Sequence, residues 1–308
     1  MTGPVLPLVM LLDELKMPFG DAIAAARSLG AEYVWFHDGP GKKSLPQMSG
    51  TEVDAIGESL ERASLKLLVA RAASAFKSVH AIDIDPSRVM DNSAYRRDYE
   101  DVVRAMEAAR RLGVPAVCVF SFAWPGEYTA GKPTWPMRWA TRGGIISEGE
   151  MERLAAAFAP VMQAADEHEV DVVVLQLSWN YANTTGNFER LEERIASPRL
   201  KLMWNPADSV NCGEADVAEA GFRNALPYLH SLHLKDLRVV DGTRNKFDYC
   251  AIGEGDVDYP SILRQLRAHA PHAVLSVATH YSAPDGKPGS AMRTNVEHLK
   301  RLIAAIPP

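Results

Sequence analysis

Short apolar runs alternate along the chain with longer segments in which apolar residues recur at helical spacing. Several runs are apolar almost throughout, as is typical of parallel strands covered on both faces. The pattern predicts strands over Val5–Leu12, Glu32–Phe36, Leu65–Val69, Ala116–Phe120, Asp171–Leu177, Leu200–Trp204, Ser231–Leu234 and Ala273–Val277. It predicts amphipathic helices over segments such as Asp21–Leu29, Tyr95–Leu112, Met151–His168, Phe188–Ile195 and Tyr259–His269.

Local signals support these boundaries. Ser147 and Glu150 have the spacing of a capping box at a helix start. Gly30 and Gly113 each stand between a helical segment and a strand, where a glycine with positive φ ends the helix.

Eight strand–helix pairs in one chain predict a single (β/α)8 TIM barrel domain over residues 1–308. A doubly wound sheet is the alternative. It is disfavoured because Leu11–Gly20, after the first strand, is not a glycine-rich phosphate loop.

Composition narrows the classes of function. The chain has 308 residues, 47% of them hydrophobic, and a formal net charge of −6 with no basic stripe. These values fit a packed globular protein and exclude a nucleic-acid partner, which would require clustered Lys and Arg. The apolar start Met1–Leu12 contains two prolines and is too short to span a bilayer, so we expect no membrane association. The three cysteines are far apart, so we expect no disulfide framework and a cytoplasmic location.

Three predicted loops at the carboxyl ends of strands are long, and such loops commonly carry function. They span Ala73–Ser93, Ala123–Ile146 and Asp236–Asp258. All six tryptophans lie at or beyond strand ends: Trp35, Trp124, Trp135, Trp139, Trp179 and Trp204. Aromatic rings stack on the C–H faces of sugars, so the group predicts an aromatic rim for a ligand. The alternative is that the rings plug the barrel or bury a subunit contact.

The second half of the chain resembles a known family. The resemblance rests on Val172–Ser209, Leu226–Asp236, Ile252–Leu263 and Val274–His280. These segments are similar to the xylose-isomerase-like TIM barrels, which include sugar isomerases, ketose 3-epimerases, inosose dehydratases and endonuclease IV. The most specific pieces are the His-x-Lys-Asp run His233–Asp236 and the Gly-Glu-Gly segment Gly253–Gly255. Over residues 1–169 the resemblance is architectural.

The resemblance implies a divalent ion held by Glu, Asp, His and Glu at the ends of strands five to eight. This chain has Gln176, Asn205 and Ala278 at three of those positions, and only His233 matches. Amides do not ionise near pH 7, and a hard cation prefers charged oxygen ligands. We therefore expect no cofactor. A manganese or zinc site rebuilt from Asp208, His233 and His280 is the disfavoured alternative.

The candidate site residues follow from this comparison. His233, Lys235, Asp208 and His280 are the candidate proton-transfer groups. The candidate substrate-binding residues are Gln176, Asn205, Trp179, Trp204, Trp124 and His37. In purely structural interpretations, Lys235 pairs with Asp236 or Glu254, and Gln176 and Asn205 pair with each other and with His233.

Two functions remain open. One is an enzyme that isomerises, epimerises or dehydrates a sugar or polyol-type hydroxy-ketone without the metal typical of the family. The other is a non-catalytic carbohydrate-binding protein or partner subunit. A nuclease like endonuclease IV is disfavoured because the matched positions lack zinc ligands. The expected partners are a small sugar-like ligand and, from the resemblance, further copies of this chain.

Overall fold

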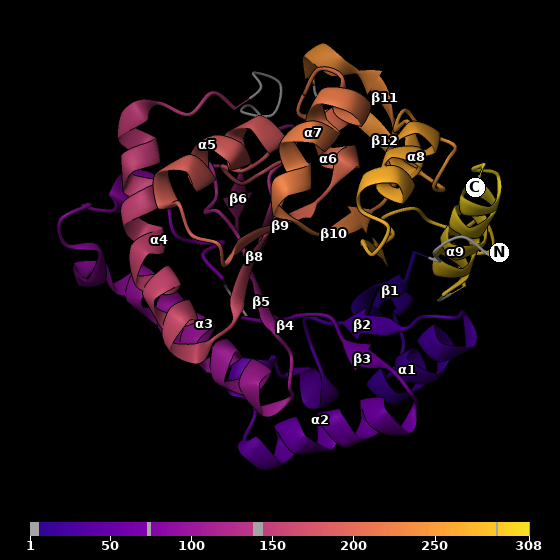
Figure 1. Ribbon diagram of the computed structural model, residues 1–308, viewed down its shortest axis with the longest axis horizontal. Coiled ribbons are helices and arrows are strands. Elements are labelled where there is room, and N and C mark those ends of the chain that lie inside the picture. Colours follow the sequence, from indigo (N-terminus) through magenta and orange to yellow (C-terminus); the bar gives the residue numbers. More distant parts are fainter. Residues whose placement is uncertain (1–5, 73–74, 138–143, 245, 288, 308) are drawn as a thin grey trace.

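A closed parallel barrel forms the centre of the molecule, and helices surround it (Figure 1). The computed structural model describes residues 6–72, 75–137, 144–244, 246–287 and 289–307. Its main sheet has nine strands in the order β3-β2-β1-β13-β10-β9-β8-β5-β4, and every neighbouring pair is parallel. The strands are β1 Leu8–Leu11, β2 Tyr33–Trp35, β3 Lys66–Leu67, β4 Ala70–Arg71, β5 Ala116–Val119, β8 Asp171–Leu175, β9 Leu200–Trp204, β10 Leu229–Leu234 and β13 Val274–Val277.

The two edges of this sheet belong to one strand position. β3 pairs with β2, β4 pairs with β5, and only Leu68 and Val69 separate the two pieces in the chain. The sheet therefore closes on itself with eight strand positions, which confirms the predicted TIM barrel and excludes the doubly wound alternative.

The helices follow the predicted alternation with the strands. They are α1 Phe19–Ser28, α2 Gly50–Arg62, α3 Ser93–Arg111, α4 Glu148–His168, α5 Thr185–Ile195, α6 Pro206–Asn211, α7 Phe222–Ala225, α8 Tyr259–His269 and α9 Ser290–Ala304. The capping box of Ser147 and Glu150 starts α4, and Gly30 and Gly113 have positive φ after α1 and α3. The apolar runs that predicted strands are buried; Val172, Val173 and Val174 have no exposed surface.

Two of the predicted long loops contain strands. The segment Asp236–Asp258 includes an antiparallel hairpin of β11 Asp236–Asp241 and β12 Lys246–Cys250. The segment Ala123–Ile146 includes a shorter hairpin of β6 Tyr128–Thr129 and β7 Lys132–Pro133. Charged and polar residues interrupt their apolar residues, and most positions are partly or fully exposed, so no continuous apolar run signalled them. Trp139 lies outside the described residues.

The described residues also bear on the cysteines and on membrane-spanning helices. Cys118 and Cys212 are buried, Cys250 is half-buried, and all three are free thiols. Within residues 6–307, apart from the gaps given above, no helix has the length and apolarity needed to cross a membrane.

Candidate active site

The carboxyl ends of strands β8, β9 and β10 bring several predicted site residues together. Gln176 follows β8, Asn205 follows β9, and His233 and Lys235 lie at the end of β10. All four are buried, and so is Asp208 on α6. In TIM barrels this end of the barrel carries the chemistry, because the loops that follow the strands meet there.

An ion pair lies at the centre of this cluster. Lys235 Nζ is 3.0 Å from Asp208 Oδ1, and the two side chains are only 4% and 5% exposed. Asp208 Oδ2 also accepts hydrogen bonds from the backbone N–H of Ser178 (3.2 Å) and from Asn205 Nδ2 (3.0 Å). Burial lowers the pKa of Lys235, but Asp208, Tyr249 and Glu14 together outweigh it and raise that pKa to about 12. Lys235 is therefore a fixed ammonium group at neutral pH.

The alternative partners proposed for Lys235 were wrong. Asp236 points into the following turn and accepts backbone N–H groups of Leu237, Gly253, Gly255 and Val257. The Gly-Glu-Gly segment therefore organises the backbone beside the site, while Asp208 holds Lys235.

The two amides do not pair with each other. Gln176 Nε2 donates to the carbonyl of Asn183 and to Ser209 Oγ, both at 2.8 Å, and its Oε1 has no partner. Asn205 is the N-cap of α6, where Oδ1 accepts from the Asp208 N–H at 3.1 Å. The interpretation in which Gln176, Asn205 and His233 satisfy one another is therefore wrong. Gln176 Oε1 is therefore a buried acceptor without a partner among the described residues.

Two histidines flank Trp35 in the barrel. The ring centroids of His233 and His37 lie 5.8 and 5.5 Å from that of Trp35. Burial lowers the pKa of both histidines well below the usual range; Lys235 adds to the effect at His233 and Arg71 at His37. His233 Nδ1 has no hydrogen-bond partner. Both imidazoles are therefore neutral near pH 7 and suited to hydrogen bonding with hydroxyl groups.

The β11–β12 hairpin supplies an aromatic wall that the sequence did not reveal. Tyr249 lies 4.8 Å from the ring of His280, and Lys235 Nζ lies 5.6 Å from the Tyr249 ring centroid. Outward from there, Phe247 contacts Tyr249 and Trp135 contacts Phe247, both at 5.0 Å. A groove of about 530 Å³ runs along these rings. Desolvation, then Lys235, lowers the pKa of His280 to about 3, although the residue as a whole is still exposed.

The other predicted tryptophans differ in access. Trp179 is 5% exposed and packs on Phe120 and Tyr128, with centroids 4.9 and 4.7 Å away. Trp124 and Trp204 have no exposed surface, so neither presents a ring face to a ligand in this structure. Trp124 stacks on Tyr181 at 4.0 Å, which makes it part of the packing behind the site.

Glu14 is a site residue that sequence reasoning missed. It lies in the 3₁₀ turn Leu12–Leu15 directly after β1 and is half-buried beside a hollow of about 130 Å³. Desolvation raises the pKa of Glu14 to about 7, although Lys235 and Lys16 oppose the shift. A carboxyl group that titrates near neutral pH is suited to accept and return protons. The only available signal was its position after a barrel strand.

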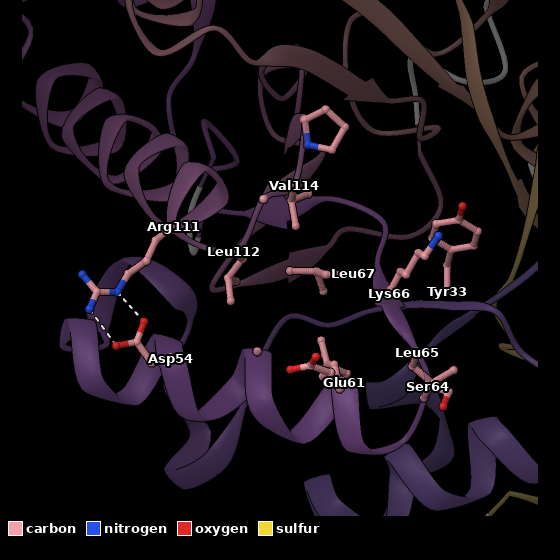
Figure 2. A pocket seen from close by; sticks show the side chains of 14 residues that line it. Tyr33, Asp54, Glu61, Ser64, Leu65, Lys66, Leu67, Arg111, Leu112 and Val114 are labelled. Carbon is pink, nitrogen blue, oxygen red and sulfur yellow. Dashed lines mark hydrogen bonds and ion pairs between the residues drawn. The ribbon is translucent and has the colours of Figure 1, made fainter.

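A larger cavity lies elsewhere. It has a volume of about 830 Å³ and lies between α2, α3 and the starts of β3 and β5 (Figure 2). At its rim Arg111 donates to both Asp54 oxygens, at 2.6 and 2.7 Å. This is the amino end of the barrel strands, which in this fold serves stability, so size does not identify the active site.

Comparison with known proteins agrees with this architecture. The family model described as xylose isomerase-like TIM barrel matches residues 23–302. The chain belongs to the xylose isomerase-like TIM barrel family. No curated protein sequence matches it at a significant level.

Solved structures of this family share the fold at low sequence identity. A xylose isomerase domain protein from Planctomyces limnophilus has a TM-score of 0.69 at 15% identity and covers 99% of each chain. A D-psicose 3-epimerase from Clostridium cellulolyticum H10, solved with D-tagatose, has a TM-score of 0.65 at 17% identity over 98% of this chain and 96% of its own. The IolI protein with a bound zinc atom has a TM-score of 0.72 at 14% identity over 97% and 98%.

The metal that the xylose isomerase-like family implies does not fit the side chains present. Asn205 uses both amide atoms on Asp208, and the Asp208 carboxylate is already paired with Lys235. In the part of the chain that the structure describes, no group of three His, Cys, Asp or Glu side chains could hold a metal ion. The rebuilt site of Asp208, His233 and His280 is therefore not assembled here. The fixed positive charge in this cluster belongs to Lys235.

Proposed function

We propose that this protein is an isomerase or epimerase-type enzyme that moves a proton beside the carbonyl group of a sugar or polyol-type hydroxy-ketone. One observation carries the proposal: the buried Lys235–Asp208 ion pair, with Nζ 3.0 Å from Oδ1, lies at the carboxyl ends of the strands within electrostatic reach of the half-buried Glu14 carboxyl group. Family membership and the epimerase among the structural neighbours support the same class of reaction.

The chemistry needs a base and a fixed positive charge. Ionised Glu14 removes the proton on the carbon next to the carbonyl, and the electron pair moves to the carbonyl oxygen as an enediolate forms. The Lys235 ammonium stabilises that oxyanion, since a preorganised charge in a dry site stabilises developing negative charge strongly. Return of the proton to the former carbonyl carbon, as the hydroxyl proton moves to the enediolate oxygen, gives the isomer. Epimerisation requires a second group to donate a proton on the opposite face, while Glu14 releases its own proton to water.

The remaining polar groups orient the substrate. Asp208 positions Lys235 and keeps it protonated. The free Gln176 Oε1 and the neutral rings of His233 and His37 offer partners for hydroxyl groups. We propose that a divalent metal takes no part, because Lys235 supplies the positive charge.

Proton exchange tests the proposal directly. The protein is incubated in D2O with ketopentoses, ketohexoses and their acid and phosphate derivatives, and NMR follows the loss of the C–H signal next to the carbonyl. We expect exchange by the wild type and a loss of at least 100-fold in Glu14→Gln. Glu58→Gln, an exposed glutamate on α2, serves as the matched control and should keep full activity.

Two results would contradict the proposal. Sugar binding without exchange by the wild type would favour the carbohydrate-binding alternative. A stoichiometric divalent ion, measured by mass spectrometry on protein purified without chelator, would show that Lys235 does not replace the metal.

We also propose that the protein acts in a reducing cytoplasm as a homo-oligomer. The three free thiols are compatible with a reducing compartment. Sedimentation at several concentrations would show a species larger than 33.8 kDa if the second part is right.

A further inference from the structure

A buried arginine lies at the mouth of the barrel without a carboxylate partner. Arg71 is the last residue of β4 and is 3% exposed. Its Cζ lies 5.2 Å from the centroid of the Phe120 ring, and its Nε has no hydrogen-bond partner. Among the described residues it makes no ion pair. A buried charge without a partner is costly, so natural proteins retain one mainly where it has a function.

Two carboxylates act on Arg71 without pairing with it. Asp13 and Asp38 affect Arg71 electrostatically but do not contact it as ion-pair partners. Asp13 instead accepts the backbone N–H groups of His37 and Asp38, at 2.7 and 3.1 Å. Its orientation is fixed by those bonds, so it does not turn toward the guanidinium.

A second cation faces the same ring. Lys77, in the loop after β4, places Nζ 5.1 Å from the Phe120 centroid and 5.9 Å from the Tyr128 centroid. It is half-buried and has no ion pair within the ranges that the structure describes. Desolvation, then Arg71, lowers the pKa of Lys77 to about 7. Two neighbouring positive charges disfavour each other's protonated form, and an anion between them stabilises both.

The surroundings connect this cation pair to the candidate active site. Phe120 and Tyr128 also pack on Trp179, so the pair shares its wall with a predicted substrate-binding residue. Arg71 is near enough to lower the pKa of both His37 and His233. The carboxylates Glu14 and Asp208 interact with Lys235 instead, so neither provides Arg71 or Lys77 with an ion-pair partner.

We propose that Arg71 and Lys77 hold an oxyanion on the substrate, a carboxylate or a phosphate, with its carbon skeleton against Phe120, Tyr128 and Trp179. Arg presents a fork of N–H groups that matches such oxygens, and Lys adds a point charge. The substrate class is thus an acidic sugar derivative, with its anionic end at β4 and its carbonyl at Lys235. The inference rests on the proposed function only in taking this mouth as the substrate site.

Calorimetric titration tests the inference without needing turnover. The probes are D-fructose, D-fructose 6-phosphate and 5-keto-D-gluconate, which share a ketose skeleton but differ in charge. We expect one or both anionic probes to bind at least 30-fold more tightly than D-fructose, and the preferred one distinguishes phosphate from carboxylate. Equal affinity for all three, or binding of D-fructose alone, would overturn the inference.

Variants separate recognition from folding. Arg71→Met and Lys77→Met should each weaken the anionic probe at least 10-fold, while Arg111→Met, at the opposite end of the barrel, should not. Arg71→Met should also raise the melting temperature of the unliganded protein, since it removes an unpaired buried charge. Unchanged affinity in both variants, or a lowered melting temperature with normal binding, would show that Arg71 is structural.

The outcomes also distinguish this inference from the proposed function. Tight binding of an anionic probe without proton exchange would support the oxyanion site and count against the enzyme. Proton exchange on neutral D-fructose, uninhibited by the anionic probes, would support the enzyme and overturn the oxyanion site.

Discussion

Glu14 is held in an environment that favours its neutral form. Its ordinary pKa of 4.5 rises to about 7 in the folded protein, so the fold binds a proton more tightly than the unfolded chain does. Stability from this group is therefore full below pH 4.5 and declines as pH rises toward 7. The full decline amounts to roughly 3.5 kcal/mol, since the pKa rises by about 2.5 units and each unit corresponds to about 1.4 kcal/mol.

Glu14→Gln should remove that pH dependence. Denaturant unfolding between pH 4.5 and 8 should show a flatter stability profile in the variant than in the wild type. In the exchange assay, the wild-type rate should rise with pH through an apparent pKa near 7, because the ionised carboxylate is the base. If the variant had the same pH dependence of stability and of exchange rate as the wild type, Glu14 would be neither the titrating group nor the base.

The Lys235–Asp208 pair gives a second prediction for single residues. Asp208→Asn leaves the Lys235 ammonium buried without its counter-charge, and it should cost about 3–5 kcal/mol of stability. Lys235→Met should cost a similar amount. The double variant should recover much of this loss, because two neutral side chains replace two charges, and urea unfolding of all four proteins measures the coupling. Additive losses would show that the two charges do not stabilise each other.

At the scale of elements, the β11–β12 hairpin depends on a close backbone approach. A Cβ on Gly255 would lie nearer to the Asp236 carboxylate and the Leu237 carbonyl than real Cβ atoms do. Gly255→Ala must therefore displace Asp236 from the N–H groups that it accepts. We expect a loss of about 3 kcal/mol and weaker ligand binding, because Lys235 directly precedes Asp236.

Gly20→Ala provides the matched control for that substitution. Gly20 lies in α1 with no atom within 4 Å of the added Cβ, so alanine should be neutral or stabilise by up to about 1 kcal/mol. Thermal unfolding of both variants compares them. Equal changes in thermal stability would mean that the backbone at Gly255 does not lie close to Asp236 and Leu237.

The sequence predicted the elements better than the site. Runs such as Asp171–Leu177 are apolar enough to identify buried strands, and the capping box at Ser147 is a local signal. The partners of Lys235 could not be deduced, because Asp208 lies on α6 after β9 and Glu14 lies in the turn after β1, and only assembly of the barrel brings them near Lys235. In the sequence, Arg71 is a single charged residue after an apolar run, and its sequence neighbours do not show that it lacks an ion-pair partner. The hairpin residues Phe247 and Tyr249 lacked the apolar pattern of a buried strand.

At the scale of the whole molecule, the barrel has a weak position. β8 pairs on both sides, with β5 and β9, whereas β3 and β4 are two-residue pieces that each pair on one side. Hydrogen exchange should therefore be slowest in residues 171–175 and markedly faster in residues 66–71. Mass spectrometry of the exchanged peptides measures this difference, and equal protection would contradict it.

That weak position lies beside Arg71. Leu68 and Val69 alone connect β3 to β4 at this strand position. β2, which is followed by His37, lies on one side, and β5, which is followed by Phe120, lies on the other. A ligand that reaches from Arg71 toward His37 would connect the β4 side of this position to the β2 side. The bound molecule would then be part of what keeps the barrel shut, and its departure would leave a protein more open to proteases at this point. The same few atoms would then both bind the ligand and stabilise the closed barrel.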